Sequence, residues 1–83
     1  MLKYDFEKRE NSSSKESKYE YLYKCLKNDI MNGRLAEGSK LPSKRALAEE
    51  NGISVKTVMN AYEQLLMEGY IVSRERSGYY VVS

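Results

Sequence analysis

The feature that most constrains this chain is a very short break between two segments with helical patterning. Ser43 is suited to cap the first segment, which ends at Gly52, where glycine adopts a left-handed C-cap with little strain. Ser54 is suited to cap the second segment, whose apolar side chains recur every three or four residues as far as Gly69. A tight, glycine-containing turn between two short helices is typical of a helix-turn-helix motif. The predicted helices of this motif cover residues 43–51 and 54–68.

A further helix is predicted before this pair, and a β-hairpin after it. Apolar residues recur at helical spacing over 18–32, and Gly33 ends that pattern. Residues 70–76 and 79–82 have the composition of strands, and Ser77-Gly78 is predicted to be the turn between them. We expect a positive φ at Gly78 in that turn. The predicted fold is mainly α with a small β-hairpin: a winged helix-turn-helix of three helices and a two-stranded wing.

The composition limits the chemistry that one small domain of 83 residues can perform. Histidine is absent, which excludes histidine-based catalytic dyads and triads and histidine metal ligands. The single cysteine, Cys25, cannot form an internal disulfide, and we expect it to be a partly buried apolar residue. Because no acid-base or metal constellation remains, we do not expect the chain to be an enzyme.

Two further expectations concern the N-terminal end of the chain and its cellular surroundings. Residues 1–17 are poor in apolar side chains after Phe6 and run through an Asn- and Ser-rich stretch. We therefore expect a flexible N-terminal segment over 1–17 and the folded winged helix-turn-helix domain over 18–83. No positively charged stretch followed by an apolar run opens the chain, so we expect no signal sequence, and no apolar run approaches the roughly 18–20 residues that cross a bilayer. We expect a cytoplasmic protein that does not associate with membranes.

The outward face of the predicted helix 54–68 carries the first group of candidate binding residues. With Val58 turned toward the core, Lys56 and Asn60 fall on the opposite side, next to Thr57. A recognition helix enters the major groove with the residues of its first turns, where asparagine can pair with adenine and lysine with guanine. An ordinary solvated helix face is the alternative interpretation, and the position directly after the tight turn argues against it.

Four more cations flank this face in the predicted fold. Lys44 and Arg45 oppose the dipole of their own helix, which is mildly unfavourable for folding and points to a contact with DNA phosphate or guanine. Arg74 and Arg76 flank the expected wing turn, with Glu75 on the opposite face of the strand. These two arginines could contact DNA, or they could protect an edge strand from aggregation.

The eight tyrosines admit more than one interpretation. Tyr19, Tyr23, Tyr62 and Tyr70 could fill a small core, or they could stack on bases as in proteins that bind single strands. A tyrosine-rich first helix together with the hairpin could also dock another protein. The alternative function is therefore a winged-helix module for protein interaction, without DNA binding, and the net charge of +2 is too small to decide.

Several spaced motifs occur in an order that is typical of one family. They are Leu41-Pro42-Ser43-Lys44-Arg45-Ala46-Leu47-Ala48, Gly52-Ile53-Ser54, Thr57-Val58, Ala61-Tyr62-Glu63-Gln64-Leu65, Glu68-Gly69-Tyr70-Ile71 and Ser77-Gly78-Tyr79. In this order, over residues 19–82, they resemble the N-terminal DNA-binding domain of GntR-family bacterial transcription regulators. The first motif and the stretch 58–65 further resemble the MocR branch, in which a longer chain continues into an aminotransferase-like domain that binds pyridoxal phosphate.

The resemblance implies how such a domain binds operator DNA. The recognition helix 54–68 would lie in the major groove, and the wing 70–82 at the adjacent backbone or minor groove. The family's contacts fall on Arg45 at the groove edge, on Ser54, Lys56 and Thr57 at the start of the recognition helix, and on Ser77 and Gly78 at the wing tip. Val55 and Met59 depart from the family, which often has arginine at the first of these positions and a basic residue at the second.

The resemblance also implies which partners to expect. Double-stranded operator DNA is the expected ligand, and a homodimer is the expected assembly. An effector would be bound by another domain rather than by this one. No cofactor is expected in this chain, and pyridoxal phosphate is expected only in a further C-terminal domain.

Overall fold

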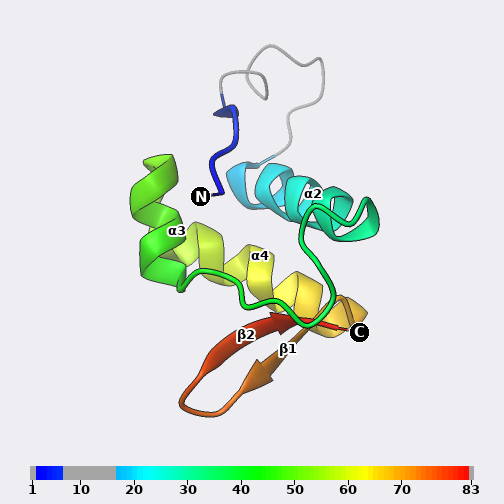
Figure 1. Cartoon of the computed structure of the whole chain (residues 1–83). Coiled ribbons are helices and arrows are strands. Elements are labelled where there is room, and N and C mark those ends of the chain that lie inside the picture. The colour runs from blue at the N-terminus through cyan, green and yellow to red at the C-terminus, as the bar shows by residue number, and fades with distance from the viewer. Residues whose placement is uncertain (1, 7–16, 83) are drawn as a thin grey trace.

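The computed structural model describes residues 2–6 and 17–82, which form three helices followed by a two-stranded antiparallel sheet (Figure 1). This architecture confirms the predicted winged helix-turn-helix. The elements are α2 (Lys18–Met31), α3 (Lys44–Asn51), α4 (Val55–Glu68), β1 (Ile71–Arg74) and β2 (Gly78–Val81). No helix in the described part of the chain is both long and apolar enough to cross a bilayer.

A serine fixes the start of each helix. Ser17 forms a capping box with Glu20 at the start of α2. Ser43 and Ser54 cap α3 and α4, as predicted, by accepting a hydrogen bond from the backbone N–H three residues further on. Ser43 and Ser54 lie just outside their helices, so α3 and α4 begin one residue later than the predicted ranges, whereas α2 begins at Lys18 as predicted. Gly52 ends α3 in the left-handed conformation, as predicted.

The core surrounds α4. Its buried residues Val58, Tyr62 and Leu65 belong to one cluster with Leu22 and Leu26 of α2, and with further residues of α3, the wing and the segment before α3. This packing leaves the opposite face of α4 at the surface. The helix that carries the main candidate residues is therefore held in place by every other element of the domain.

Some of the four tyrosines considered for the core do pack against it. Tyr62 is 1% exposed, packs edge-on against Tyr79 with the ring centroids 5.0 Å apart, and donates a hydrogen bond from its hydroxyl to the Pro42 carbonyl at 2.7 Å. Tyr23 and Tyr70 are half-buried against the core. Tyr19 is half-buried as well, but it is not part of the core cluster that the described residues form.

A short segment before α3 pairs with β2 of the wing, a contact that was not predicted from the sequence. β1 pairs with β2 from Ile71 opposite Val81 to Arg74 opposite Gly78. On the other side of β2, the Leu41 N–H donates to the Tyr79 carbonyl at 2.8 Å, and the Val81 N–H donates to the Ser39 carbonyl at 2.9 Å. Lys40 forms an isolated antiparallel bridge with Tyr80 between these bonds. The segment before α3 is thus attached to the free side of β2 by an isolated bridge and its flanking hydrogen bonds.

The turn of the wing lies earlier than expected. β1 ends at Arg74 rather than at residue 76, and residues 75–77 connect the strands, closed by a 3.0 Å hydrogen bond from the Ser77 N–H to the Arg74 carbonyl. Arg76 has a φ of +63° in this turn, a conformation that sequence rules reserve mainly for glycine and asparagine. For this reason the prediction of Ser77-Gly78 as the turn was wrong, as was the placement of Glu75 on a strand face. The predicted positive φ at Gly78 is confirmed at +133°.

Residues 2–6 lie against the helices, and the sequence analysis did not anticipate these contacts either. Leu2, Tyr4 and Phe6 pack against the core. The Asn51 side chain accepts from the Tyr4 N–H at 2.7 Å and donates to the Leu2 carbonyl at 2.9 Å. The expected flexibility of the N-terminal segment remains a prediction, and residues 1 and 7–16 lie outside the described residues.

Candidate nucleic-acid interface

The start of α4 presents polar side chains on the face opposite its buried stripe. Lys56 is exposed, and Thr57 and Asn60 are half-buried. The Ser54 hydroxyl accepts from the Thr57 N–H and lies 2.8 Å from the Thr57 hydroxyl, so both hydroxyls serve the helix cap. Lys56 and Asn60 make no side-chain hydrogen bond with any described residue. These two side chains are therefore placed to bind a ligand from the first turns of α4.

The start of α3 carries two cations in different surroundings. Arg45 is exposed. Lys44 is half-buried, and its Nζ lies 5.7 Å from the centroid of the Tyr79 ring in β2. This distance fits a cation–π contact, which connects the start of α3 to the wing. Lys44 and Arg45 have no carboxylate within ion-pair distance among the described residues, so no described acidic side chain neutralises their charges.

The wing holds its two arginines in different ways. The Arg74 guanidinium lies 4.7 Å from the centroid of the Tyr80 ring, and the Tyr80 hydroxyl is hydrogen-bonded to the Ser77 hydroxyl. Arg76 is exposed in the turn itself. Arg74 is thus positioned by an aromatic ring, whereas Arg76 extends from the tip. Because β1 is an edge strand, both the DNA-contact and the anti-aggregation interpretations of these arginines stay open.

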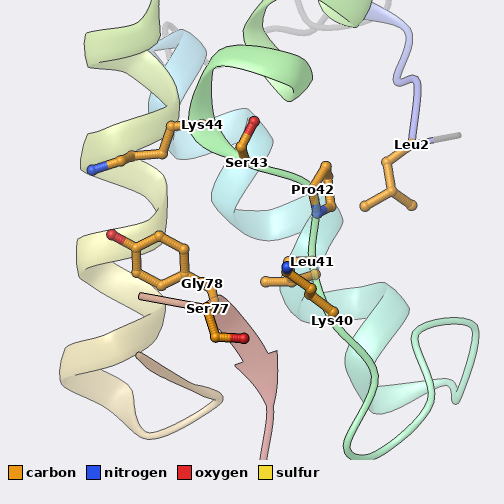
Figure 2. Close-up of a pocket in the computed structure, with 9 residues that line it drawn as sticks. Leu2, Lys40, Leu41, Pro42, Ser43, Lys44, Ser77 and Gly78 are labelled. Carbon is orange, nitrogen blue, oxygen red and sulfur yellow. The ribbon is translucent and has the colours of Figure 1, made fainter. Parts of the chain in front are cut away.

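A hollow joins the start of α3 to the wing turn (Figure 2). Its volume is about 590 Å³. The candidate residues Lys44, Ser77 and Gly78 line it together, and none of its lining residues is acidic. The remaining lining residues are Leu2, Lys40, Leu41, Pro42, Ser43 and Tyr79. The structure thus brings one predicted residue of the start of α3 together with two of the wing tip, while Arg45, Arg74, Arg76 and the start of α4 do not line the hollow.

Lys40 is the residue of this hollow that sequence reasoning missed. It stands in a stretch without helical period, and it reaches the wing through the bridge to Tyr80, a pairing between segments far apart in the sequence. No local pattern predicts such a contact. The position of Lys40 beside the wing depends on the pairing of its segment with β2.

The described residues contain no cluster of metal-binding side chains. Within residues 2–6 and 17–82, no group of three or more Cys, Asp or Glu side chains could hold a metal ion. Cys25 is half-buried on α2, as expected. Burial raises the pKa of the Tyr62 hydroxyl above its ordinary value, so this group stays protonated. The surface of this winged helix-turn-helix instead presents a polar face at the start of α4, with cations on the neighbouring elements.

The chain belongs to the GntR family. Residues 18–81 match the family described as "Bacterial regulatory proteins, gntR family". Among its relatives is the HTH-type transcriptional regulator YdeL of Bacillus subtilis, which is 53% identical over 62 residues that cover 75% of this chain and 13% of YdeL. A probable rhizopine catabolism regulatory protein of Rhizobium meliloti, MocR, is 42% identical over 62 residues, again 75% of this chain and 13% of the relative. The chain therefore spans about an eighth of the length of these relatives.

Solved structures share the fold. YtrA from Sulfolobus acidocaldarius, a GntR-family transcription factor, superposes with a TM-score of 0.80 at 39% identity, over 86% of this chain and 74% of YtrA. The DNA-binding domain of AraR, solved in complex with operator ORX1, superposes with a TM-score of 0.79 at 24% identity, over 86% of both chains. The similarity to MocR agrees with the branch that the sequence motifs indicate. The domain is that of a family of regulatory proteins rather than of enzymes.

Proposed function

We propose that this chain is the operator-reading domain of a bacterial GntR-type transcription regulator and binds double-stranded DNA in a sequence-specific manner. The observation that carries the proposal is the start of α4, where Lys56 and Asn60 lie on a surface face directly after the tight turn from α3. In helix-turn-helix proteins this part of the second helix reads base edges in the major groove. The AraR domain with the same fold was solved on an operator, which supports this arrangement.

Each group of residues has its own role in the proposed complex. Lys56 and Asn60 read bases, and the N-terminus of α4, with Ser54 and Thr57, favours a phosphate. Arg45 contacts the groove edge, and Lys44 the backbone beside it. The wing lies against the adjacent backbone or minor groove. Its contacts there come from residues 74–78, through Arg74, Arg76, Ser77 and Gly78. Base contacts would specify the sequence, and phosphate contacts would fix the orientation of the domain.

The proposal extends to the protein in which this domain works. We infer a cytoplasmic regulator that binds its operator as a homodimer. In helix-turn-helix proteins the two half-sites of an operator match the two-fold symmetry of a dimer. The effector would bind outside this chain. If a pyridoxal-phosphate domain exists, it belongs to a longer protein, as the similarity to MocR and the small share of the relatives that is covered suggest.

The alternative function is a winged-helix module that docks another protein. Met31 at the end of α2 is 67% exposed, and Val72 on the hairpin is 39% exposed, so both elements of the suggested docking surface carry apolar side chains at the surface. The dependence of binding on salt concentration distinguishes the two functions. DNA binding releases condensed counterions and weakens steeply with salt, whereas an apolar protein interface does not.

Selection of bound duplexes from a random pool tests the proposal. We expect repeated selection to enrich one short motif, and binding to that motif to fall steeply as salt is raised. A pool that stays random after selection, or binding that is insensitive to salt, would contradict sequence-specific DNA recognition and favour the protein-docking alternative.

A further inference from the structure

The hollow between α3 and the wing contains a cation to which the proposed function gives no role. Lys40 is exposed, and no described carboxylate lies within ion-pair distance of it. Its backbone is fixed to the centre of the wing by the bridge to Tyr80 and by the hydrogen bond from the Leu41 N–H to the Tyr79 carbonyl. The position of this lysine is therefore set by the sheet rather than by a mobile loop.

The Lys40 side chain crosses the wing at Gly78. A Cβ atom at position 78 would lie 3.1 Å from Lys40 Cε and 3.9 Å from Lys40 Nζ. The first of these distances is tighter than side chains normally allow, so the lysine stem occupies space that is open because residue 78 is glycine. Gly78 thus leaves room for the Lys40 side chain, and it also adopts a positive φ.

We propose that Lys40 contacts a phosphate of the DNA backbone, and that the hollow receives the sugar–phosphate unit to which this phosphate belongs. This inference rests on the proposed function and extends the interface by one residue and one site. Lys44, Ser77 and Gly78, already placed at the DNA, line the same hollow (Figure 2). A DNA strand that touches both the start of α3 and the wing turn has to pass in front of it.

The chemistry of the hollow fits a sugar–phosphate unit. Lys40 and Lys44 are the charged residues of its lining, and without an acidic neighbour they attract an anion. Leu41, Pro42 and the Tyr79 ring supply an apolar surface against which a deoxyribose can pack. A volume of about 590 Å³ leaves room for more than a bare phosphate and lies within the roughly 300–1,000 Å³ of pockets that hold small organic groups.

The first test compares Lys40→Gln with the wild type on a duplex of random sequence, titrated by fluorescence anisotropy at several salt concentrations. Loss of one phosphate contact should lower the salt slope by about one, so the affinity advantage of the wild type should shrink roughly fourfold between about 50 and 200 mM salt. Lys18→Gln is the matched control, because it removes the same charge from an exposed position at the start of α2, outside the hollow. We expect this control to keep the wild-type slope.

The second test identifies the phosphate. A single neutral methylphosphonate is moved along the duplex, and the position that weakens the wild type but not Lys40→Gln marks the contact. Gly78→Ala should also weaken binding, and less so in a Lys40→Ala background, because the shorter side chain removes the clash.

The outcomes separate this inference from the proposed function. If the wild type binds no duplex at all, the proposed function fails. If the wild type binds and Lys40→Gln has the same salt slope as Lys18→Gln, the proposed function stands and the Lys40 contact is overturned. A methylphosphonate scan in which every position affects the wild type and Lys40→Gln equally would overturn it as well.

Discussion

Two polar side chains hold residues 2–6 on the core. The Asn51 amide pairs with the Tyr4 N–H and the Leu2 carbonyl, so it satisfies a backbone donor and a backbone acceptor of the same segment. The Tyr4 hydroxyl donates to Asp29 at 2.7 Å, and Arg34 lies 3.6 Å from the same carboxylate. Sequence composition did not predict this attachment, because it depends on single partners that lie far away in the chain.

Tyr4 makes the stability of the domain sensitive to alkaline pH. Burial, together with the hydrogen bond to Asp29, raises the pKa of Tyr4 above its ordinary value of 10.0. The folded chain therefore keeps this phenol neutral where the unfolded chain ionises, so its stabilisation is complete below about pH 10 and is lost as the pH rises further. Tyr4→Phe should lower the free energy of unfolding by about 1–2 kcal/mol near neutral pH. Urea unfolding of both proteins checks this, and the difference should shrink above about pH 10; a constant difference would contradict it.

Arg45 and Arg76 test the distinction between reading and anchoring at single residues. Loss of a base contact costs about 1–3 kcal/mol and relaxes discrimination at one base pair, whereas loss of a phosphate contact weakens binding to all sequences. We expect Arg45→Ala to flatten the preference at one position of a selected site, and Arg76→Ala to weaken selected and random duplexes alike. Competition titrations with single-base variants of the site measure both effects. Equal behaviour of the two variants would refute the division of roles.

At the scale of elements, local chemistry explains what the sequence could predict. The starts of α3 and α4 follow from Ser43 and Ser54, because a serine cap needs only the backbone three residues ahead. The position of the wing turn does not follow, since Arg76 adopts a positive φ that no residue-type rule assigns to arginine. The bridge at Lys40 depends on pairing with β2, which sequence patterns do not encode locally.

Gly78 links the conformation of the wing to its function. Gly78→Val would place a β-branched residue at a φ of +133° and a Cβ atom 3.1 Å from Lys40 Cε. We expect the wing to distort and DNA affinity to fall, while the three helices remain folded because they share a core in which Gly78 takes no part. Far-ultraviolet circular dichroism and anisotropy titration measure the two effects separately. Unchanged DNA affinity in this variant would show that the geometry of the wing does not matter.

At the scale of the whole molecule, the sequence predicted the candidate surface better than it predicted how its parts meet. The face with Lys56 and Asn60 follows from helical periodicity around Val58, and it lies at the surface as expected. The hollow shared by Lys44, Ser77 and Gly78 could not be predicted, because it is formed by α3, the wing and the segment before α3 together. The net charge of +2 gives no indication of this arrangement. In the hollow, Lys40 and Lys44 lie near one another without acidic neighbours.

The central claim is that α4 reads DNA sequence from its first turns, and Asn60 tests it most directly. Fluorescence anisotropy should compare the wild type with Asn60→Ala on a selected duplex and on a scrambled duplex of the same composition. The account predicts that Asn60→Ala loses about 1–3 kcal/mol on the selected duplex and almost nothing on the scrambled one. Equal binding of both proteins to the selected duplex, or equal losses on the two duplexes, would contradict base reading by Asn60 on this face of α4.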